Sequence, residues 1–152
     1  MKIYIDMDGV IADFHGWMKF HIPDIDENMW RNTNIPWQVM NDNYQVCYLN
    51  LEPLHLLEHM NYLYNSLDDV KFLTAIPTDW WDNYKGEIAK LNKTTWLEKY
   101  INNFNEDDVI FSRGAHDKIQ YAEPGAVLYD DREDTISAWN HAGGIGIHVK
   151  GL

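Results

Sequence analysis

Five short apolar runs alternate with longer stretches of helical periodicity, and this alternation restricts the possible folds more than any other feature of the sequence. Residues 82–101 and 132–142 repeat apolar side chains three and four positions apart, which is the spacing of one face of a helix. Strands that alternate with helices in this way are typical of a parallel sheet. We therefore predict an α/β fold with a five-stranded parallel sheet flanked by helices. The predicted strands are KIYID at 2–6, VKFLTA at 70–75, VIFSR at 109–113, AVLYDD at 126–131 and IGIHV at 145–149.

Residues 14–65 interrupt the alternation with a segment that contains no convincing strand. The segment is rich in Trp, Tyr, Asn and Asp, and prolines divide it into short pieces, of which residues 52–67 are the strongest predicted helix. We predict a small helical cap inserted after the first strand, and a core made of residues 1–13 and 66–152. Ligands of open parallel sheets bind outside the carboxyl ends of the strands, so the cap is expected to lie over that edge as a lid.

The composition excludes several classes of protein. A chain of 152 residues, 45% of them hydrophobic, can bury one core and is too short for two independent ones. Its 24 acidic residues against 12 lysines and arginines give a net charge of −12, which repels a nucleic-acid polymer but leaves room for small anions at a locally positive site. Cys47 is the single cysteine, which excludes an internal disulfide and a zinc site made of thiolates.

The same features indicate where the protein is found. A single cysteine fits a reducing compartment. Asp6 and Asp8 interrupt the first apolar run, so no leader peptide is expected, and nowhere is an apolar run long enough to span a membrane. We therefore expect a cytoplasmic protein with no membrane partner.

Polar side chains that suit phosphate chemistry stand at the carboxyl ends of the predicted strands, where they converge although they are far apart in sequence. Four aspartates gathered there would repel one another strongly, and a hard divalent cation such as Mg²⁺, which binds carboxylates and phosphates, is the usual compensation. A hydroxyl and an ammonium aimed at the same point would stabilise negative charge on phosphoryl oxygens. The set predicts phosphoryl-transfer chemistry. Its members are Asp6, Asp8, Thr74, Arg113, Lys118, Asp130 and Asp131.

The order of these residues resembles the four motifs of the haloacid-dehalogenase-like phosphohydrolases. DMDGV at 6–10, Thr74 at the end of a strand, Lys118, and the acidic pair in LYDDRED at 128–134 follow one another as those motifs do. Within that superfamily the sequence is most similar to the 5′(3′)-deoxyribonucleotidases and their bacterial and phage relatives, which share an opening like DMDGVIADF, a helix like TTWLEKY and an ending like DDRED. The resemblance implies a Rossmann-like core with a helical cap, and a Mg²⁺-dependent phosphomonoesterase that acts on nucleoside monophosphates.

The resemblance also implies a role for each acidic residue. Asp6 would attack phosphorus and carry an aspartyl phosphate, while Asp8 would protonate the leaving oxygen and later take a proton from water. Asp6, Asp130 and the backbone carbonyl of Asp8 would bind Mg²⁺. Asp131 would lie behind them and orient either a metal-bound water or Lys118.

The phosphate-binding residues match the family less completely. Thr74 and Lys118 would hold the phosphate oxygens. A small hydroxyl residue often follows the motif threonine in the family, whereas Ala75 stands there, so the Ala75 backbone amide is left as the donor at that position. The basic motif tends to be compact in the family, whereas GAHD separates Arg113 from Lys118. Whether Arg113 or His116 binds the phosphate is therefore left open.

Aromatic residues in and near the cap allow two interpretations. The chain has seven tryptophans and nine tyrosines, and most of those in the cap are expected to build its core, because the cap has few aliphatic side chains. One or two rings could instead stack on a nucleobase, an interaction that hardly distinguishes one base from another. Phe14 and Trp17, which follow Asp8 by about one helical turn, are the candidates for such a base pocket.

Two other functions stay open at this point. A Mg²⁺-dependent phosphatase of sugar phosphates or of another small monoester would use the same residues, with the cap serving only to exclude water. A module that binds a nucleotide or accepts a phosphoryl group without turnover would also combine acidic residues, Thr and Lys on a parallel sheet, although receiver modules place the acidic pair first rather than last. The sequence leaves open the base, the sugar, the position of the phosphate, and whether the protein is a monomer or a homodimer.

Overall fold

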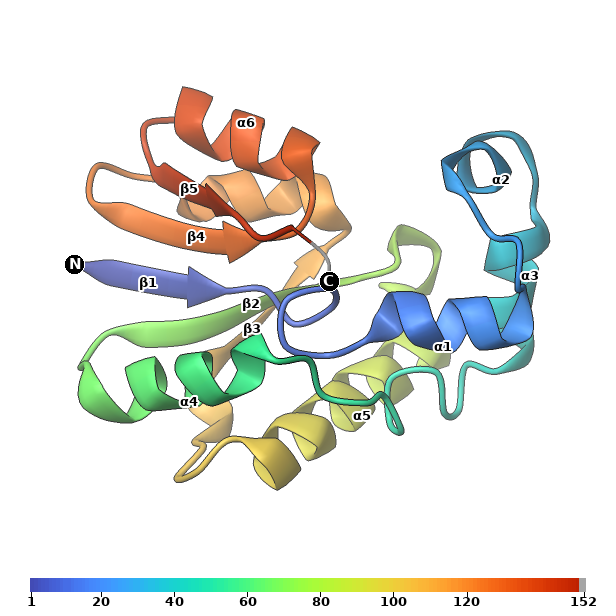
Figure 1. Cartoon of the computed structure of the whole chain (residues 1–152), viewed down its shortest axis with the longest axis horizontal. Helices are drawn as coiled ribbons and strands as arrows, with labels where there is room; N and C mark the ends of the chain where they lie inside the picture. The colour runs from blue at the N-terminus through green and yellow to red at the C-terminus, as the bar shows by residue number, and fades with distance from the viewer. Residues whose placement is uncertain (151–152) are drawn as a thin grey trace.

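A computed structural model describes residues 1–150 and confirms the predicted α/β fold (Figure 1). Its five strands form one all-parallel sheet in the order β3-β2-β1-β4-β5. β1 is central, and its residue Ile3 pairs with Val70 of β2 on one side and with Val127 of β4 on the other. Each strand ends within one residue of its predicted bounds. The strands are β1 (Lys2–Ile5), β2 (Val70–Ile76), β3 (Val109–Arg113), β4 (Ala126–Asp130) and β5 (Ile145–His148).

Helices cover both faces of the sheet, as is usual for parallel strands that are joined by crossover connections. In Figure 1, α4 (Leu56–Ser66) and α5 (Tyr84–Tyr100) lie below the sheet, whereas α6 (Glu133–His141) and the 3-10 helix η3 (Ala115–Tyr121) lie above it. Among residues 1–150, no helix is long and apolar enough to cross a membrane. Two further 3-10 helices are η1 (Thr78–Trp80) and η2 (Glu106–Asp108).

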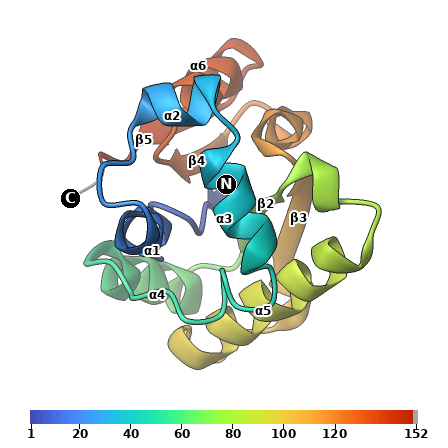
Figure 2. The same ribbon diagram turned by 90° about the vertical axis from the view of Figure 1, so that its right-hand side faces the viewer.

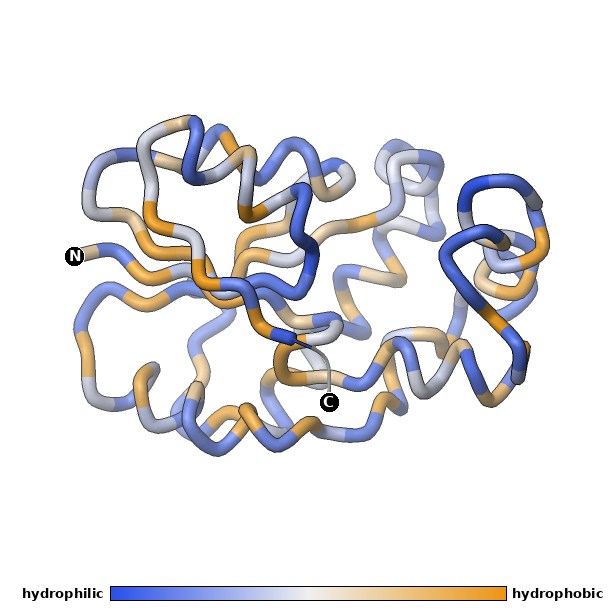
Figure 3. The backbone as a smooth tube through the Cα atoms, turned by 45° about the horizontal axis from the view of Figure 1, so that its top comes forward, coloured by the Kyte–Doolittle hydropathy of each residue, from blue (hydrophilic) through white to orange (hydrophobic). Residues whose placement is uncertain are grey.

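The side chains of each strand alternate between the two faces and build two separate hydrophobic clusters. Ile3 and Ile5 of β1, with Phe72 of β2, belong to the cluster that includes residues of α4 and α5. Tyr4 of β1 and Leu73 of β2 belong to the cluster that includes residues of α6. Figure 3 shows the hydrophobic segments concentrated along the strands between these layers. The position of a residue along its strand therefore decides which helices its side chain can meet.

Three short helices lie beyond the carboxyl ends of the strands. They are on the right in Figure 1 and towards the viewer in Figure 2, and they comprise α1 (Phe14–His21), α2 (Glu27–Asn32) and α3 (Ile35–Asp42). Asp13 and Asp26 precede α1 and α2, and each side chain accepts a hydrogen bond from an amide in the first turn of its helix. Helix α4, by contrast, packs beside β2. The division of the chain into a core and a cap domain stays a prediction.

Hydrogen bonds fasten the segment between residues 41 and 54 to the core. The Leu54 amide donates to the Ile11 carbonyl at 2.8 Å, and the indole of Trp96 in α5 donates to the Leu51 carbonyl at 2.8 Å. The indole of Trp80 in η1 donates to the side-chain oxygen of Asn41 in α3, also at 2.8 Å. Both indoles are buried, so each bond satisfies a polar group that would otherwise be unfavourable in the interior. These bonds fix the helices beyond the strands relative to the sheet.

Candidate active site

The loop after β1 turns sharply and places two aspartates at the edge of the sheet. Asp6 directly follows β1, and its carboxylate accepts a hydrogen bond from the Met7 amide at 2.8 Å. The amides of residues 10–12 all donate to the Met7 carbonyl, which closes the turn. Gly9 lies at φ +81°, a conformation that L side chains rarely adopt, so glycine at this position permits the turn.

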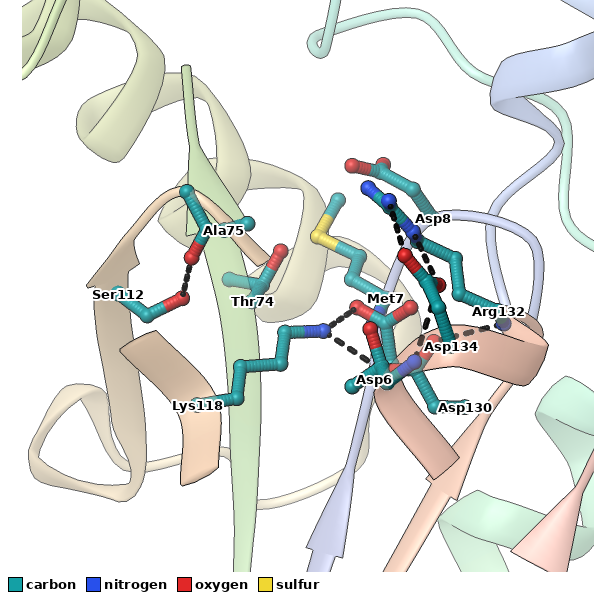
Figure 4. A network of polar contacts seen from close by, with 12 residues as sticks. Asp6, Met7, Asp8, Thr74, Ala75, Ser112, Lys118, Asp130, Arg132 and Asp134 are labelled. Carbon is teal, nitrogen blue, oxygen red and sulfur yellow. Dashed lines mark hydrogen bonds and ion pairs between the residues drawn. The ribbon is translucent and has the colours of Figure 1, made fainter. Parts of the chain in front are cut away.

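A buried lysine joins Asp6 to the end of β4. Lys118 lies in η3 and is 2% exposed, and its Nζ is 2.9 Å from Oδ1 of Asp6 and 2.8 Å from Oδ2 of Asp130. Figure 4 shows the ammonium reaching both carboxylates. Ile5 pairs with Tyr129 in the parallel ladder, so the residues that follow them, Asp6 and Asp130, end up side by side. The structure thus brings together three of the predicted site residues, one from the loop after β1 and two from the region between η3 and the end of β4.

Three carboxylates at this edge lie close enough to hold one metal ion. Ligand oxygens of Asp6, Asp130 and Asp131 all lie within 4.8 Å of one another. Lys118 supplies one positive charge against three potential negative charges, and a divalent cation would offset the remainder. A Cβ at Gly9 would overlap the Asp131 carboxylate, so glycine also makes the space that Asp131 occupies. A cluster of carboxylate oxygens is the ligand set that Mg²⁺ prefers, and these residues therefore fit the metal that the sequence implies.

Burial and crowding shift the pKa values of this cluster. The pKa of Asp6 lies well above its usual range, first because the carboxyl is buried and next because Asp130 is close, with Lys118 acting in the opposite direction. Burial, and then the nearby Asp130, raise the pKa of Asp131 to about 7. Burial lowers the pKa of Lys118, but Asp6 and Asp130 outweigh it and leave that pKa above its usual value. Lys118 therefore stays charged, and a bound cation would favour ionisation of both carboxyl groups.

A second buried lysine reaches the site from the opposite face of the sheet. Lys93 lies in α5 and is 0% exposed. Its Nζ donates to Oγ1 of Thr74 at 2.7 Å, to the carbonyl of Ala75 at 2.8 Å and to Oδ2 of Asp8 at 2.9 Å. The same Nζ lies 4.2 Å from the centre of the Tyr48 ring, a distance at which a cation is attracted to the face of a ring. One lysine from each face of the sheet therefore holds the carboxylates of the loop after β1.

Lys93 was not among the site residues predicted from the sequence, although the sequence contains a sign of it. Ala89, Trp96 and Leu97 each lie three or four positions from Lys93, so they share its face of α5, and all four residues are buried. A lysine in the middle of an apolar helix face needs a partner, because an unpaired buried charge is strongly unfavourable. That spacing could have identified Lys93 as a candidate.

The Asp8 carboxylate has one paired and one unpaired oxygen. Oδ2 accepts the hydrogen bond from Lys93. Oδ1 is buried, and no group among residues 1–150 donates a hydrogen bond to it. An unpaired acceptor of this kind is rare in protein interiors, where most buried polar atoms have a partner. Oδ1 is therefore an acceptor that no described group satisfies. The predicted contact of the Asp8 backbone carbonyl with a metal stays a prediction.

The other predicted phosphate-binding residues lie in different surroundings. Arg113 ends the edge strand β3, and its side chain is 48% exposed with its Nη2 3.5 Å from Oδ2 of Asp82. His116 is exposed and lies 3.3 Å from Asp117. In the part of the chain that the structure describes, neither side chain makes an ion pair or hydrogen bond with the acidic cluster. Ala75 is close to the site, and its carbonyl is one of the groups that Lys93 binds.

A row of aromatic rings leads from Lys93 towards α1. Tyr48, whose ring lies against Lys93, is buried and stacks on Phe14 with ring centres 5.5 Å apart and planes inclined by 25°. Phe14 in turn stacks on Trp17 at 6.1 Å and 16°. Phe14 and Trp17 are only partly buried, so their rings present some surface beside the loop that carries Asp8. Their predicted part in a base pocket stays a prediction.

The sequence matches no model of a known protein family, and no curated protein matches it significantly. A function is therefore inferred from the side chains and their geometry.

Proposed function

We propose that this protein is a Mg²⁺-dependent phosphomonoesterase of the haloacid-dehalogenase type that forms an aspartyl phosphate on Asp6. One observation above all supports the proposal. Asp6 and Asp130 share the buried ammonium of Lys118, with Asp131 close enough to complete a metal-binding group. Three carboxyl groups at the strand ends, with one ammonium between two of them, are suited to a cation and a phosphate, because ligands of parallel sheets bind there.

Asp6 is the nucleophile in this proposal. Among the described residues, the hydrogen bond from Met7 and the ion pair with Lys118 both fall on Oδ1, so we assign the attack on phosphorus to Oδ2. The bond from phosphorus to the ester oxygen breaks as the bond to Oδ2 forms. Mg²⁺, bound by Asp6 and Asp130 with Asp131 near it, would offset the negative charge of the cluster and of the phosphoryl oxygens.

Asp8 moves the protons in both steps. The neutral carboxyl of Asp8 gives its proton to the departing ester oxygen, and the resulting carboxylate then takes a proton from a water that attacks the aspartyl phosphate. Attack by the water oxygen breaks the bond between phosphorus and Oδ2, releases inorganic phosphate and restores both aspartates. Oδ1 of Asp8 has no hydrogen-bond partner among the described residues, so a proton on it is not held by another group of the protein.

Thr74 and Lys118 hold the phosphate oxygens. Thr74 is buried on β2 and Lys118 on η3, and both side chains lie near Asp6 (Figure 4). A hydroxyl and an ammonium in fixed positions stabilise the charge that develops on the phosphoryl group, and they do so without having to reorganise. The Ala75 amide is proposed as a further donor.

Nucleoside monophosphates are the proposed substrates, as for a 5′(3′)-deoxyribonucleotidase. The partly exposed rings of Phe14 and Trp17 support this choice, because they lie beside the Asp8 loop and a nucleobase could stack on them. The single, buried Cys47 is consistent with a cytoplasmic location, which we propose for the protein.

Phosphate release by the purified protein tests the proposal. The substrates are deoxyribo- and ribonucleoside monophosphates with the phosphate at either position, and several sugar phosphates, each with Mg²⁺ or with EDTA. We expect metal-dependent hydrolysis of the nucleotides, its loss in Asp6→Asn, and normal activity in Asp24→Asn, which changes an exposed carboxylate. Hydrolysis of sugar phosphates alone would be compatible with the proposed mechanism but would refute the nucleotidase function. No hydrolysis of any substrate would refute the enzyme and favour a binding module.

A further inference from the structure

We propose that Lys93 is a positioning residue, which orients the proton-transferring oxygen of Asp8 and the phosphate-binding hydroxyl of Thr74 at the same time. This inference rests on the proposed phosphomonoesterase function. Its basis is the junction of three elements at one ammonium: α5 supplies Lys93, the loop after β1 supplies Asp8, and β2 supplies Thr74 and Ala75.

The contacts of Lys93 leave it no donor for a substrate. An ammonium has three N–H groups, and Nζ donates to three oxygens, those of Asp8, Thr74 and Ala75, at 2.7 to 2.9 Å. The side chain is also fully buried and lies against the Tyr48 ring, so it has little freedom to turn towards a ligand. Lys93 therefore acts through its neighbours, in contrast to Lys118.

Lys93 decides which oxygen of Asp8 can transfer the proton. Its bond to Oδ2 fixes the plane of the carboxylate, and Oδ1 is then left buried without a donor among residues 1–150. We therefore assign the transferred proton to Oδ1, because no described group binds it, whereas Oδ2 is occupied by Lys93. Without the ammonium, the carboxylate could rotate about its bond to Cβ, and the acid would be correctly placed for only part of the time.

The same ammonium orients the Thr74 hydroxyl. The Oγ1 of Thr74 accepts a hydrogen bond from Lys93, so the hydroxyl proton must point away from Nζ. It is then available to donate to a phosphoryl oxygen. Placement of the leaving-group acid and of a phosphate donor is therefore coupled through one side chain.

The leaving group of the substrate distinguishes positioning of Asp8 from a general structural role. A nucleoside monophosphate releases a poor, alkoxide-like leaving group that needs the acid, whereas p-nitrophenyl phosphate releases a stable phenolate that hardly needs it. General acid catalysis contributes about 10²- to 10⁴-fold, so we expect Lys93→Met to lower kcat for a nucleoside monophosphate by at least about 100-fold. For p-nitrophenyl phosphate we expect a loss of no more than about 10-fold, which corresponds to the weaker contact of Thr74 with phosphate alone.

Three further measurements separate the outcomes. Lys99→Met, an exposed position in the last turn of the same helix, should change neither substrate. If Lys93→Met does not fold, Lys93→Gln takes its place in the same comparison. Its shorter, uncharged amide has two N–H groups for the three oxygens, so we expect a smaller loss that is still selective for the nucleoside monophosphate. Competitive inhibition by inorganic phosphate should weaken in Lys93→Met, because no donor then orients the Thr74 hydroxyl, and should weaken less in Lys93→Gln.

Equal losses of kcat on the two substrates in the folded variant would overturn the proposal, as would no loss on either. A selective loss on the nucleoside monophosphate would support it. If the wild-type protein hydrolyses neither substrate, the proposed function itself fails, and the assignment of Lys93 fails with it.

Discussion

The exchange of Lys118 for methionine is expected to destabilise the protein in a way that depends on both pH and metal. Lys118 is 2% exposed and pairs with two carboxylates at 2.9 and 2.8 Å, one of which, Asp130, is 0% exposed. Methionine has a similar length and no charge, so Lys118→Met leaves the space filled and removes the cation. Asp6, Asp130 and Asp131 then face one another without compensation.

The size of the effect follows from the burial of the pair. Removal of one partner of a buried ion pair typically costs about 3–5 kcal/mol, because the remaining charge is left unpaired. In a chain of 152 residues each 1 kcal/mol lowers Tm by about 2–4 °C, so we expect a decrease of about 6–20 °C in EDTA.

The pH dependence has a defined sign. The pKa of Lys118 is raised, so its contribution is complete at all pH values below its ordinary range and is lost only as pH rises through the raised value. The pKa values of Asp6 and Asp131 are also raised, and protonation of these carboxyls relieves their repulsion at lower pH. The decrease in Tm caused by Lys118→Met should therefore be larger at about pH 8 than at about pH 5.5. Addition of Mg²⁺ should raise the Tm of the variant more than it raises the Tm of the wild type.

Thermal unfolding followed by circular dichroism measures this prediction, with Lys2→Met as the control. Lys2 lies 3.0 Å from Glu123, but both side chains are half exposed, so loss of that pair should have little effect on stability. If Lys118→Met lowers Tm in EDTA by no more than Lys2→Met does, the buried cation does not compensate the acidic cluster as inferred.

Three further perturbations test the site. Because protons compete with the metal at Asp131, whose pKa is raised to about 7, Mg²⁺ should raise the Tm of the wild-type protein more at about pH 8 than at about pH 5.5. In EDTA, the raised pKa of Asp131 should make stability fall as pH rises between about 4 and 7. Equal Mg²⁺-induced shifts in Tm at the two pH values would contradict this competition. Gly9→Ala should destabilise by about 1–3 kcal/mol and weaken the effect of Mg²⁺, because it combines an unfavourable φ with an overlap on Asp131. Gly125→Ala has nearly the same φ with open space around it, so the overlap is disproved if both variants respond equally to Mg²⁺. Phe14→Ala should lower kcat/KM for nucleoside monophosphates by about 5- to 150-fold, the equivalent of about 1–3 kcal/mol of base stacking, and should leave any hydrolysis of a sugar phosphate nearly unchanged; equal decreases would exclude a base contact.

The sheet and the meeting of Asp6, Lys118 and Asp130 could be predicted because both depend on short-range patterns. Strands buried on two faces appear as continuous apolar runs, such as KIYI and AVLYD. Once strands are known to be parallel, the residues that follow them must lie at one edge. The position of a residue just after a strand therefore fixes its neighbourhood without knowledge of the side-chain packing.

The surroundings of Arg113 and Lys93 depend on features that no local pattern determines. Arg113 ends β3, which lies at the edge of the sheet, and strand order follows from the packing of the whole chain. Lys93 reaches the site only because α5 is packed on the sheet with that face inward. A periodic pattern identifies the buried face of a helix, but it does not identify the strand residue that the face meets.

The central position of β1 has a consequence for how the protein folds during its synthesis. Ile3 pairs with Val70 and Val127, so both edges of the strand are completed by segments that are made much later. Contacts between such distant residues form slowly, because long loops must close before any pairing energy is gained. Until β4 has emerged, the apolar β1 keeps an open edge, which is the kind of surface on which incomplete chains aggregate. The strand that precedes the proposed nucleophile is thus also a part of the nascent chain that needs protection until its partners are made.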